Sequence, residues 1–246
     1  MKPGSDSFFI KLEHVSKQFP LPSGVFTALD DINSGFRSGE FTCVVGRSGS
    51  GKSTLMNMIT GIDKPTSGKI LVDGQAIQEL SENERTLWRG KNLGIVFQFY
   101  QLIPVLSLLE NVMLPMQIKG DLNQQACEEK AMQLLSTVNL LDQATQRPEK
   151  ASGGQQQCAA IARALANDPP ILIADEPTGN LGSEDAAMVM EIFMRLVQAG
   201  KTVIMVTHDN DLAKKAGRVL QLSDGRIVGD LSSAHATVKT ARTLQQ

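Results

Sequence analysis

The amino-acid sequence predicts an α/β fold in which a parallel sheet is flanked by an antiparallel β region and interrupted by a helical insertion. Short apolar runs rich in β-branched residues alternate with helical patterns along most of the chain, which is typical of an α/β layer architecture. These runs are apolar throughout rather than alternating, as expected for parallel strands that are covered on both faces. Turn-rich strand pairs near both ends predict the antiparallel region.

The predicted elements follow from these patterns in chain order. Four apolar runs are the expected buried strands: 41–45, 94–98, 171–175 and 202–208. Between these strands lie four segments with helical patterns: 53–61, 123–139, 155–167 and 185–199. Three N-terminal strands are expected at 8–15, 26–29 and 69–72, and VLQLSDGRIVG predicts a hairpin with Asp224-Gly225 at its turn.

Domain boundaries follow from the same reading. Residues 1–98 are the expected N-terminal part of the core together with the antiparallel subdomain, and residues 99–158 are a helical subdomain. Residues 159–231 complete the core, and residues 232–246 form a polar tail.

Composition limits the possible functions. A chain of 246 residues with 41% hydrophobic and 20% charged residues can bury one sizeable core. The net charge of -2 argues against wholesale nucleic-acid binding. Three scattered cysteines favour a reducing compartment over a disulfide framework. The apolar runs are too short for a membrane span or a signal peptide, which predicts a soluble, cytoplasmic chain.

A glycine-rich segment carries the most specific signal. GRSGSGKS at residues 46–53 matches the pattern G-x-x-x-x-G-K-[ST], with a predicted strand before it and a helix after it. Glycines let the backbone N–H groups wrap closely around phosphate oxygens, and the helix N-terminus adds positive potential. Lys52 is expected to reach the β- and γ-phosphates of a nucleotide, and the Ser53 hydroxyl is expected to bind Mg²⁺.

The segment ILIADEP supplies acidic partners for this loop. Asp175 ends an apolar strand, so its carboxylate is expected at the edge of the sheet where α/β proteins bind ligands. There it can hold Mg²⁺ through water. Glu176 follows directly and is placed to act as a general base toward the attacking water.

Together with ASGGQ at residues 151–155, these motifs make the chain resemble the ATP-binding-cassette ATPases. The resemblance runs from about residue 9 to residue 228 and implies a P-loop NTPase core that hydrolyses ATP with Mg²⁺. It also implies a homodimer that sandwiches two ATP molecules, with Ser152, Gly153 and Gly154 facing the γ-phosphate of ATP on the second subunit. Taken alone, SGG at a helix start is more often a plain cap.

The resemblance assigns further roles. Gln98 contacts Mg²⁺ or the attacking water, His208 hydrogen-bonds the γ-phosphate, and Phe19 stacks on the adenine ring. The implied catalytic residues are therefore Glu176, His208 and Gln98, and the implied metal ligands are Ser53, Gln98 and Asp175. The implied nucleotide-binding residues are Phe19, Gly46, Arg47, Ser48, Gly49, Ser50, Gly51, Lys52, Ser53, Thr54, Ser152, Gly153, Gly154 and Gln155.

Two longer segments narrow the resemblance. FQFYQLIPVLSLLENVMLP and ADEPTGNL are similar to the LolD/MacB-like ATPases of lipoprotein release and macrolide export. This implies a separate FtsX-type permease with an extracytoplasmic domain, and the export or extraction of a lipoprotein, peptide, lipid or drug. The chain would then work peripherally, at the cytoplasmic face of the inner or plasma membrane. A regulatory ATPase that drives a non-transporting membrane partner is the alternative, and a soluble cassette acting on DNA or ribosomes is a third class.

A short segment at the start of the helical insertion is the expected contact for the permease. Its residues either line a groove for a short coupling helix or form the core of the insertion, and these are Tyr100, Leu102, Ile103, Leu106 and Leu109.

The chain departs from the family pattern at four positions. Arg47 stands in place of Pro, and Ala151 replaces the usual Leu of LSGGQ. Cys158 replaces an Arg, and Gly182 replaces an Asp that bridges the two ATP sites in the family. The lysine and the acids are all present, so the sequence still predicts an active ATPase.

Overall fold

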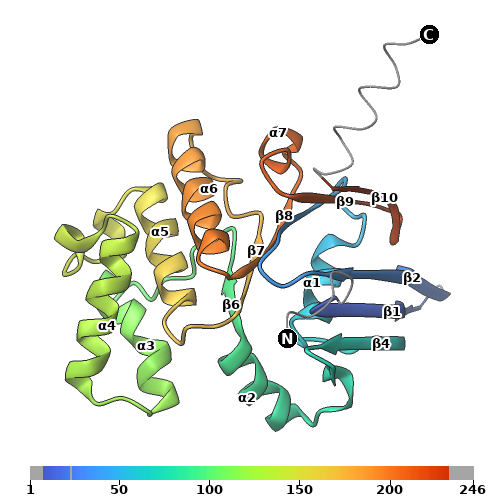
Figure 1. Ribbon diagram of the computed structural model, residues 1–246, viewed down its shortest axis with the longest axis horizontal. Coiled ribbons are helices and arrows are strands. Elements are labelled where there is room, and N and C mark those ends of the chain that lie inside the picture. Colours follow the sequence, from blue (N-terminus) through green and yellow to red (C-terminus); the bar gives the residue numbers. More distant parts are fainter. Residues whose placement is uncertain (1–7, 23, 233–246) are drawn as a thin grey trace, which may run out of the picture. The chain divides into compact units, whose positions relative to one another are not determined.

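The structure, a computed structural model, describes residues 8–22 and 24–232. It divides into two units, of which unit 1 comprises residues 1–85 and 204–246 and unit 2 comprises residues 86–203 (Figure 1). Of the polar tail predicted at 232–246, only Ser232 is described, and the rest lies outside the described residues.

Unit 1 contains the predicted antiparallel sheet. Its strand order is β2-β1-β4-β5, and its strands are β1 (Ile10–Leu21), β2 (Gly24–Phe36), β4 (Ser67–Val72) and β5 (Gln75–Ala76). β1 and β2 extend well beyond the predicted segments 8–15 and 26–29, because their pairing continues past the buried part of the sheet. The far ends of this hairpin carry exposed side chains, which lack the apolar pattern of a buried strand.

A second group of strands in unit 1 holds the predicted hairpin. β3 (Phe41–Val45) pairs in parallel with β9 (Arg218–Ser223), and β9 pairs antiparallel with β10 (Arg226–Ser232). The two-residue turn between β9 and β10 is Asp224-Gly225, with φ angles of 49° and 73°. Two consecutive positive φ angles are what a type I′ hairpin turn requires, so the predicted hairpin is confirmed.

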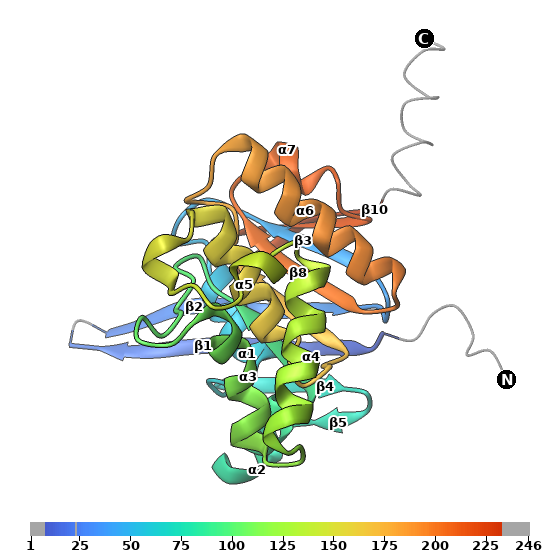
Figure 2. The ribbon, with the colours of Figure 1, turned by 90° about the vertical axis from the view of Figure 1, so that its left-hand side faces the viewer.

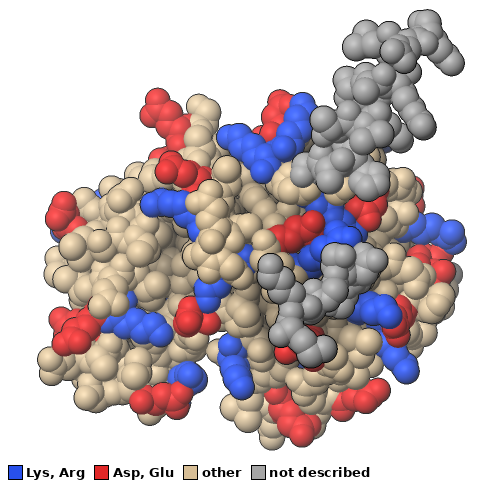
Figure 3. Space-filling model, in the orientation of Figure 1, with Lys and Arg blue, Asp and Glu red and all other residues tan. Residues whose placement is uncertain are grey.

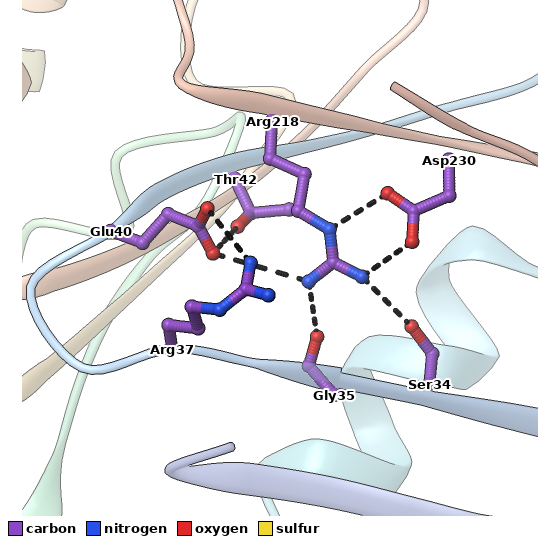
Figure 4. Close-up of polar contacts among 7 residues, drawn as sticks. All are labelled: Ser34, Gly35, Arg37, Glu40, Thr42, Arg218 and Asp230. Atoms are coloured by element: carbon purple, nitrogen blue, oxygen red, sulfur yellow. Dashed lines mark hydrogen bonds and ion pairs between the residues drawn. The ribbon is translucent and has the colours of Figure 1, made fainter. Parts of the chain in front are cut away.

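The buried Arg218 joins this hairpin to β2 (Figure 4). Its Nε and Nη2 atoms donate to the two carboxylate oxygens of Asp230 on β10, at 2.8 and 2.7 Å. Its Nη1 donates to the backbone carbonyl of Gly35 on β2. One guanidinium therefore cross-links three strands of unit 1, and Asp230 raises the pKa of Arg218 through this hydrogen bond.

Unit 2 contains the parallel pair β6 (Leu93–Val96) and β7 (Ile171–Asp175). The predicted strand 94–98 ends earlier than expected, so Gln98 lies beyond β6 in a bend rather than closing the strand. β8 (Thr202–Thr207) begins in unit 2 and continues into unit 1.

The helices of unit 2 are α3 (Leu108–Lys119), α4 (Gln124–Thr137), α5 (Gly153–Ala164) and α6 (Ser183–Gln198), with short 3₁₀ turns at Leu141–Gln143 and Pro148–Lys150. α3 and α4 lie side by side, and both contact α5, which also contacts α6 (Figure 2). The predicted helices 123–139, 155–167 and 185–199 are present, with ends shifted by one to three residues. The predicted α/β fold with a helical insertion is confirmed.

The described residues also form α1 (Lys52–Ile59), α2 (Glu82–Asn92), the short α7 (Asn210–Ala213) and a 3₁₀ turn at Ile77–Glu79. Sequence analysis missed α2, which is mostly polar. A signal for it was present, since Ser81 and Glu84 match the S-x-x-E capping box. The Ser81 backbone N–H and hydroxyl both donate to the Glu84 carboxylate, at 2.8 and 2.6 Å.

The surface of each unit carries both signs of charge. On the face shown in Figure 3, lysine and arginine side chains are interspersed with aspartate and glutamate. Among the described residues, no helix combines the length and apolarity needed to cross a membrane.

Candidate functional site

The glycine-rich loop of unit 1 has the predicted strand–loop–helix setting. All five residues of β3 are buried, and α1 begins at Lys52 directly after the loop. Gly49 and Gly51 have φ angles of 78° and 103°, a conformation that side chains disfavour. Gly51 is the N-cap of α1 and supplies no side-chain cap, so the first turn of α1 starts without a capping side chain.

Neighbouring backbone holds this loop tightly. A Cβ atom on Gly46 would lie 2.3 Å from the Leu222 carbonyl oxygen, and one on Gly51 would lie 2.6 Å from the Ala28 carbonyl oxygen. The Gly225 N–H of the β9–β10 turn donates to the Ser50 carbonyl at 3.0 Å. The loop backbone therefore has no space for a side chain at Gly46 or Gly51, and the turn of the β9–β10 hairpin anchors it through Ser50.

The polar groups of the loop fit an anionic ligand. Lys52 is only 8% exposed, and its ammonium donates to the carbonyls of Gly46 and Arg47 at 2.8 and 2.9 Å, so it lies within the curve of the loop. The Ser50 hydroxyl is buried without a hydrogen-bond partner in the described structure. A buried hydroxyl without a partner is costly, so this one is suited to a ligand oxygen. The residues present fit a nucleotide phosphate.

Two other predicted residues lie in unit 1. Phe19, on β1, is 36% exposed, with the Lys17 ammonium 5.0 Å from the centre of its ring. It pairs across the hairpin with Phe26, which is 50% exposed and which sequence analysis did not single out. His208 is exposed and follows β8 directly, just before Asp209, whose carboxylate caps α7.

In unit 2, the predicted residues Gln98, Asp175 and Glu176 lie at or just beyond the ends of β6 and β7. The parallel register pairs Val96 with Ala174. Gln98 and Glu176 are each the second residue after this pair, so both chain segments leave the sheet at the same edge. Asp175 is the last residue of β7 and is partly buried there. Glu176 has a φ angle of 49°, which marks a sharp change of direction directly after the strand.

The turn after β7 lies against Gln98. The Gly179 and Leu181 N–H groups donate to the carbonyls of Glu176 and Thr178, both at 3.1 Å, which are hydrogen bonds typical of turns. A Cβ atom on Gly179 would lie 3.0 Å from Nε2 of Gln98. The same Gln98 nitrogen lies 3.5 Å from Oδ1 of Asn180. The structure therefore brings together Gln98 and the segment that follows Glu176.

The ASGGQ segment begins α5 as a capping box. The Gln155 N–H donates to the Ser152 hydroxyl at 3.2 Å, and the Ser152 N–H donates to the Gln155 side chain at 2.9 Å. Both side chains therefore cap the N-terminus of α5, which is the role that the segment was expected to have when taken alone. The helix N-terminus still provides positive potential at Gly153 and Gly154.

Two residues that sequence analysis did not assign to the site flank this helix start. A Cβ atom on Gly153 would lie 2.8 Å from the Tyr100 hydroxyl, and one on Gly154 would lie 2.2 Å from Cγ of Asp185. Burial and the charge of Asp185 raise the pKa of Tyr100. Their proximity arises from packing between segments far apart in the chain, so no local pattern pointed to it.

Three of the positions that depart from the family pattern lie on or next to the helices α5 and α6. Ala151 is buried, and Cys158 is 1% exposed on α5. Burial, together with the charge of Asp185, raises the pKa of the Cys158 thiol to about 11, so it is an unreactive thiol. Gly182 is the N-cap of α6 and contributes no side-chain hydrogen bond.

The candidate metal ligands are few. The described residues contain no group of three or more histidine, cysteine, aspartate or glutamate side chains that could hold a metal ion. Ser53, Gln98 and Asp175 offer a hydroxyl, an amide oxygen and a carboxylate. Hard oxygen donors of this kind, in small number, suit Mg²⁺, which keeps waters and binds substrate phosphates.

The fold and these motifs define a class: a P-loop ATPase cassette with a helical insertion. Comparison with known proteins agrees. Residues 29–179 match the family described as ABC transporter. The chain is 44% identical to the lipoprotein-releasing system ATP-binding protein LolD of Aquifex aeolicus, over 84% of this chain and 92% of that protein. It is 42% identical to the macrolide export ATP-binding/permease protein MacB of Burkholderia pseudomallei, over 94% of this chain but 35% of MacB.

A solved structure shows the same fold. The ATP-binding cassette MJ0796 of Methanocaldococcus jannaschii, a dimer bound to ADP and Pi after hydrolysis, matches with a TM-score of 0.84 and 39% identity. The match covers 91% of this chain and 98% of that one. The chain belongs to the ABC transporter family, as an ATP-binding ATPase subunit of the LolD/MacB type.

Proposed function

We propose that this chain hydrolyses Mg²⁺-ATP as a homodimer and thereby powers a separate FtsX-type permease. The cargo class is a lipoprotein, peptide, lipid or drug that is exported or extracted. The register of β6 and β7 carries the catalytic assignment, because it brings the Gln98 and Glu176 segments to one sheet edge. The chain works at the cytoplasmic face of the inner or plasma membrane, held there by the permease.

In unit 1, the loop at residues 46–54 binds the phosphates of ATP. Its N–H groups and the N-terminus of α1 attract the negative charge, and the Lys52 ammonium moves from the loop carbonyls to the β- and γ-phosphate oxygens. Phe19 stacks on the adenine ring through its exposed face. His208 donates a hydrogen bond to the γ-phosphate.

In unit 2, Glu176 accepts a proton from the attacking water, and Gln98 orients that water. Gln98 and Asp175, with Ser53 of the phosphate-binding loop, would hold Mg²⁺, which would supply positive charge against the phosphates. The segment of Ser152, Gly153, Gly154 and Gln155 contacts the γ-phosphate of ATP bound to the second subunit. Because Ser152 and Gln155 cap α5 with their side chains, the backbone N–H groups of the first turn provide this contact.

The permease docks on the exposed start of the helical insertion in unit 2. Phe99 and Val105 are 70% and 72% exposed and Ile103 is 37% exposed, which makes them accessible to an apolar coupling helix. Leu102, Leu106 and Leu109 are partly buried and serve both the core and this surface. Sequence analysis singled out Ile103 but missed Phe99 and Val105.

The test is Glu176→Gln. Loss of the general base is expected to lower turnover about 10²–10⁴-fold, while ATP still binds and holds the dimer. Steady-state phosphate release measures the first effect, and size-exclusion chromatography with ATP measures the second. Glu184→Gln is the matched control, because Glu184 is an exposed acid at the start of α6. Normal turnover of Glu176→Gln would refute the assignment.

A further inference from the structure

Gln157 on α5 is a fully buried polar side chain that lies between the two strand ends of unit 2. It is 0% exposed. Its Nε2 donates to the Pro177 carbonyl at 2.8 Å and to the Phe97 carbonyl at 3.3 Å. Its Oε1 is buried and has no hydrogen-bond partner among the described residues. One amide nitrogen therefore joins two segments that are 80 residues apart in sequence.

The two acceptors fix the orientation of this amide. Both groups that face the side chain are backbone carbonyl oxygens, which can only accept, so the nitrogen rather than Oε1 must face them. A neutral side chain with two donors on one atom satisfies both carbonyls at once. Leaving the buried Oε1 without a partner is destabilising. The two hydrogen bonds that Nε2 donates to the carbonyls offset this cost.

The two carbonyls are adjacent to the residues proposed to act on the attacking water. Phe97 O belongs to the peptide group that also carries the Gln98 nitrogen, and this group is planar and rigid. Pro177 directly follows Glu176, and its ring restricts the backbone there. Holding both carbonyls to one nitrogen therefore sets the spacing of the Gln98 and Glu176 backbones.

A second residue of α5 supports the same segment. Arg163 donates from Nη2 to the Tyr100 carbonyl at 2.9 Å and from Nη1 to the Gln101 carbonyl at 2.5 Å. Both ends of the backbone from Phe97 to Gln101 are thus attached to α5, one by Gln157 and the other by Arg163. Of these two side chains, Gln157 also binds the segment after Glu176, through the Pro177 carbonyl.

We propose that Gln157 is a positioning residue for ATP hydrolysis, which sets the distance between Gln98 and Glu176 and ties both to the helix that begins with the ASGGQ segment. This rests on the proposed function, because it acts through the roles of Gln98 and Glu176. Movement of α5, when its N-terminus engages ATP on the second subunit, is passed by Gln157 directly to both residues.

The test is Gln157→Met, since methionine keeps the length and flexibility of the side chain but donates no hydrogen bond. A misplacement of reacting groups by about 1 Å costs up to ~10²-fold, so kcat is expected to fall roughly 10–100-fold. The KM for ATP is expected to stay within about 2-fold, because the phosphate-binding loop is in the other unit. Gln157→Glu, which places a carboxylate against both carbonyls, is the second variant if the first does not fold.

Gln156→Met is the matched control. Gln156 lies on the same helix, and its Nε2 donates to the Ala151 carbonyl at 3.0 Å, away from both strand ends. Turnover of this variant is expected to match the wild type. The number of bound ATP molecules per chain, measured with a non-hydrolysable analogue, corrects every kcat for the folded fraction.

A double-mutant cycle with Gln98→Ala tests whether Gln157 acts through Gln98. In that background, Gln157→Met is expected to lower kcat less than about 3-fold further. The inference would be overturned if the corrected kcat of Gln157→Met stayed near the wild-type value or fell no further than that of Gln156→Met. It would also be overturned if the effects of Gln157→Met and Gln98→Ala were fully additive. These outcomes are separate from failure of the proposed function, which is decided by the turnover of Glu176→Gln.

Discussion

Gly154 shows at the scale of one residue why the ASGGQ segment needs glycine at this position. Inside a helix, alanine is favoured over glycine by about 1 kcal/mol, so propensity alone would select alanine here. A Cβ atom at this position would lie 2.2 to 2.6 Å from the carboxylate atoms of Asp185, far inside contact distance. The Asp185 side chain would have to shift to admit an alanine, so a steric cost that originates in another helix opposes the propensity.

Gly154→Ala is expected to destabilise the protein by about 1–3 kcal/mol, as is typical of overpacking. Because the collision is with the Asp185 side chain, Gly154→Ala/Asp185→Ala is expected to recover most of this loss. Urea unfolding followed by circular dichroism measures both. A Gly154→Ala variant as stable as the wild type, or a double variant without recovery, would contradict this explanation.

The control for this prediction is Gly90→Ala. Gly90 lies in α2, and a Cβ atom there would meet nothing within 4 Å. Only propensity acts at this position, so Gly90→Ala is expected to raise the free energy of unfolding, by up to about 1 kcal/mol.

At the scale of elements, the β9–β10 hairpin depends on one buried arginine. Arg218 is 4% exposed and contacts Asp230 on β10 and Gly35 on β2 (Figure 4). The centre of the Phe8 ring lies 5.6 Å from the Cζ atom of Arg218. The same hairpin turn anchors the phosphate-binding loop through Gly225. The position of that loop thus depends partly on an ion pair outside the nucleotide site.

Asp230→Ala is expected to lower the free energy of unfolding by about 1–3 kcal/mol, because it leaves buried arginine donors without their acceptor. The effect should be measured by thermal unfolding. Asp211→Ala is the control, since Asp211 and Lys214 form a fully exposed ion pair, and its loss should leave stability unchanged. Equal effects of the two variants would show that Arg218 does not depend on Asp230.

At the scale of the whole molecule, the exposed apolar residues at the start of the insertion form the proposed docking surface for the permease. Asn111, buried on α3, holds this loop: its side chain accepts from the Ile103 N–H at 2.7 Å and donates to the Ile103 and Ser107 carbonyls at 3.1 and 2.9 Å. Val105, which is 72% exposed, therefore projects from a backbone segment that Asn111 holds on both sides. An exposed apolar surface of this kind suits an apolar helix from another chain.

Val105→Glu is expected to abolish co-purification with the co-expressed permease, because it buries a charge in an apolar contact. ATP hydrolysis by the isolated chain is expected to be unchanged, since Val105 is 72% exposed and is not one of the proposed catalytic residues. Affinity capture from detergent-solubilised membranes measures the first effect. Leu87→Glu is the control, as Leu87 is 76% exposed on α2, outside this surface. Retention of the permease by Val105→Glu would place the docking surface elsewhere.

Local patterns predicted most of the elements. β3, the phosphate-binding loop and α1 follow from an apolar run, spaced glycines and a helix start, all within about twenty residues. The Asp224-Gly225 hairpin was equally readable, because two residues dictate the turn. The long ends of β1 and β2 and the polar helix α2 were not predicted, since exposed strands and polar helices lack a buried apolar stripe.

The sequence by itself therefore determined the chemistry available to this protein: a lysine in a glycine-rich loop, acids at a strand end and a capped helix start. Only the tertiary structure decided which of these groups are held together. The Gln157 amide joins Phe97 to Pro177, and the Asp185 carboxylate excludes a side chain at Gly154. Such contacts depend on how helices and strands that are distant in the chain pack against one another. Packing of this kind produces no periodic pattern in the sequence.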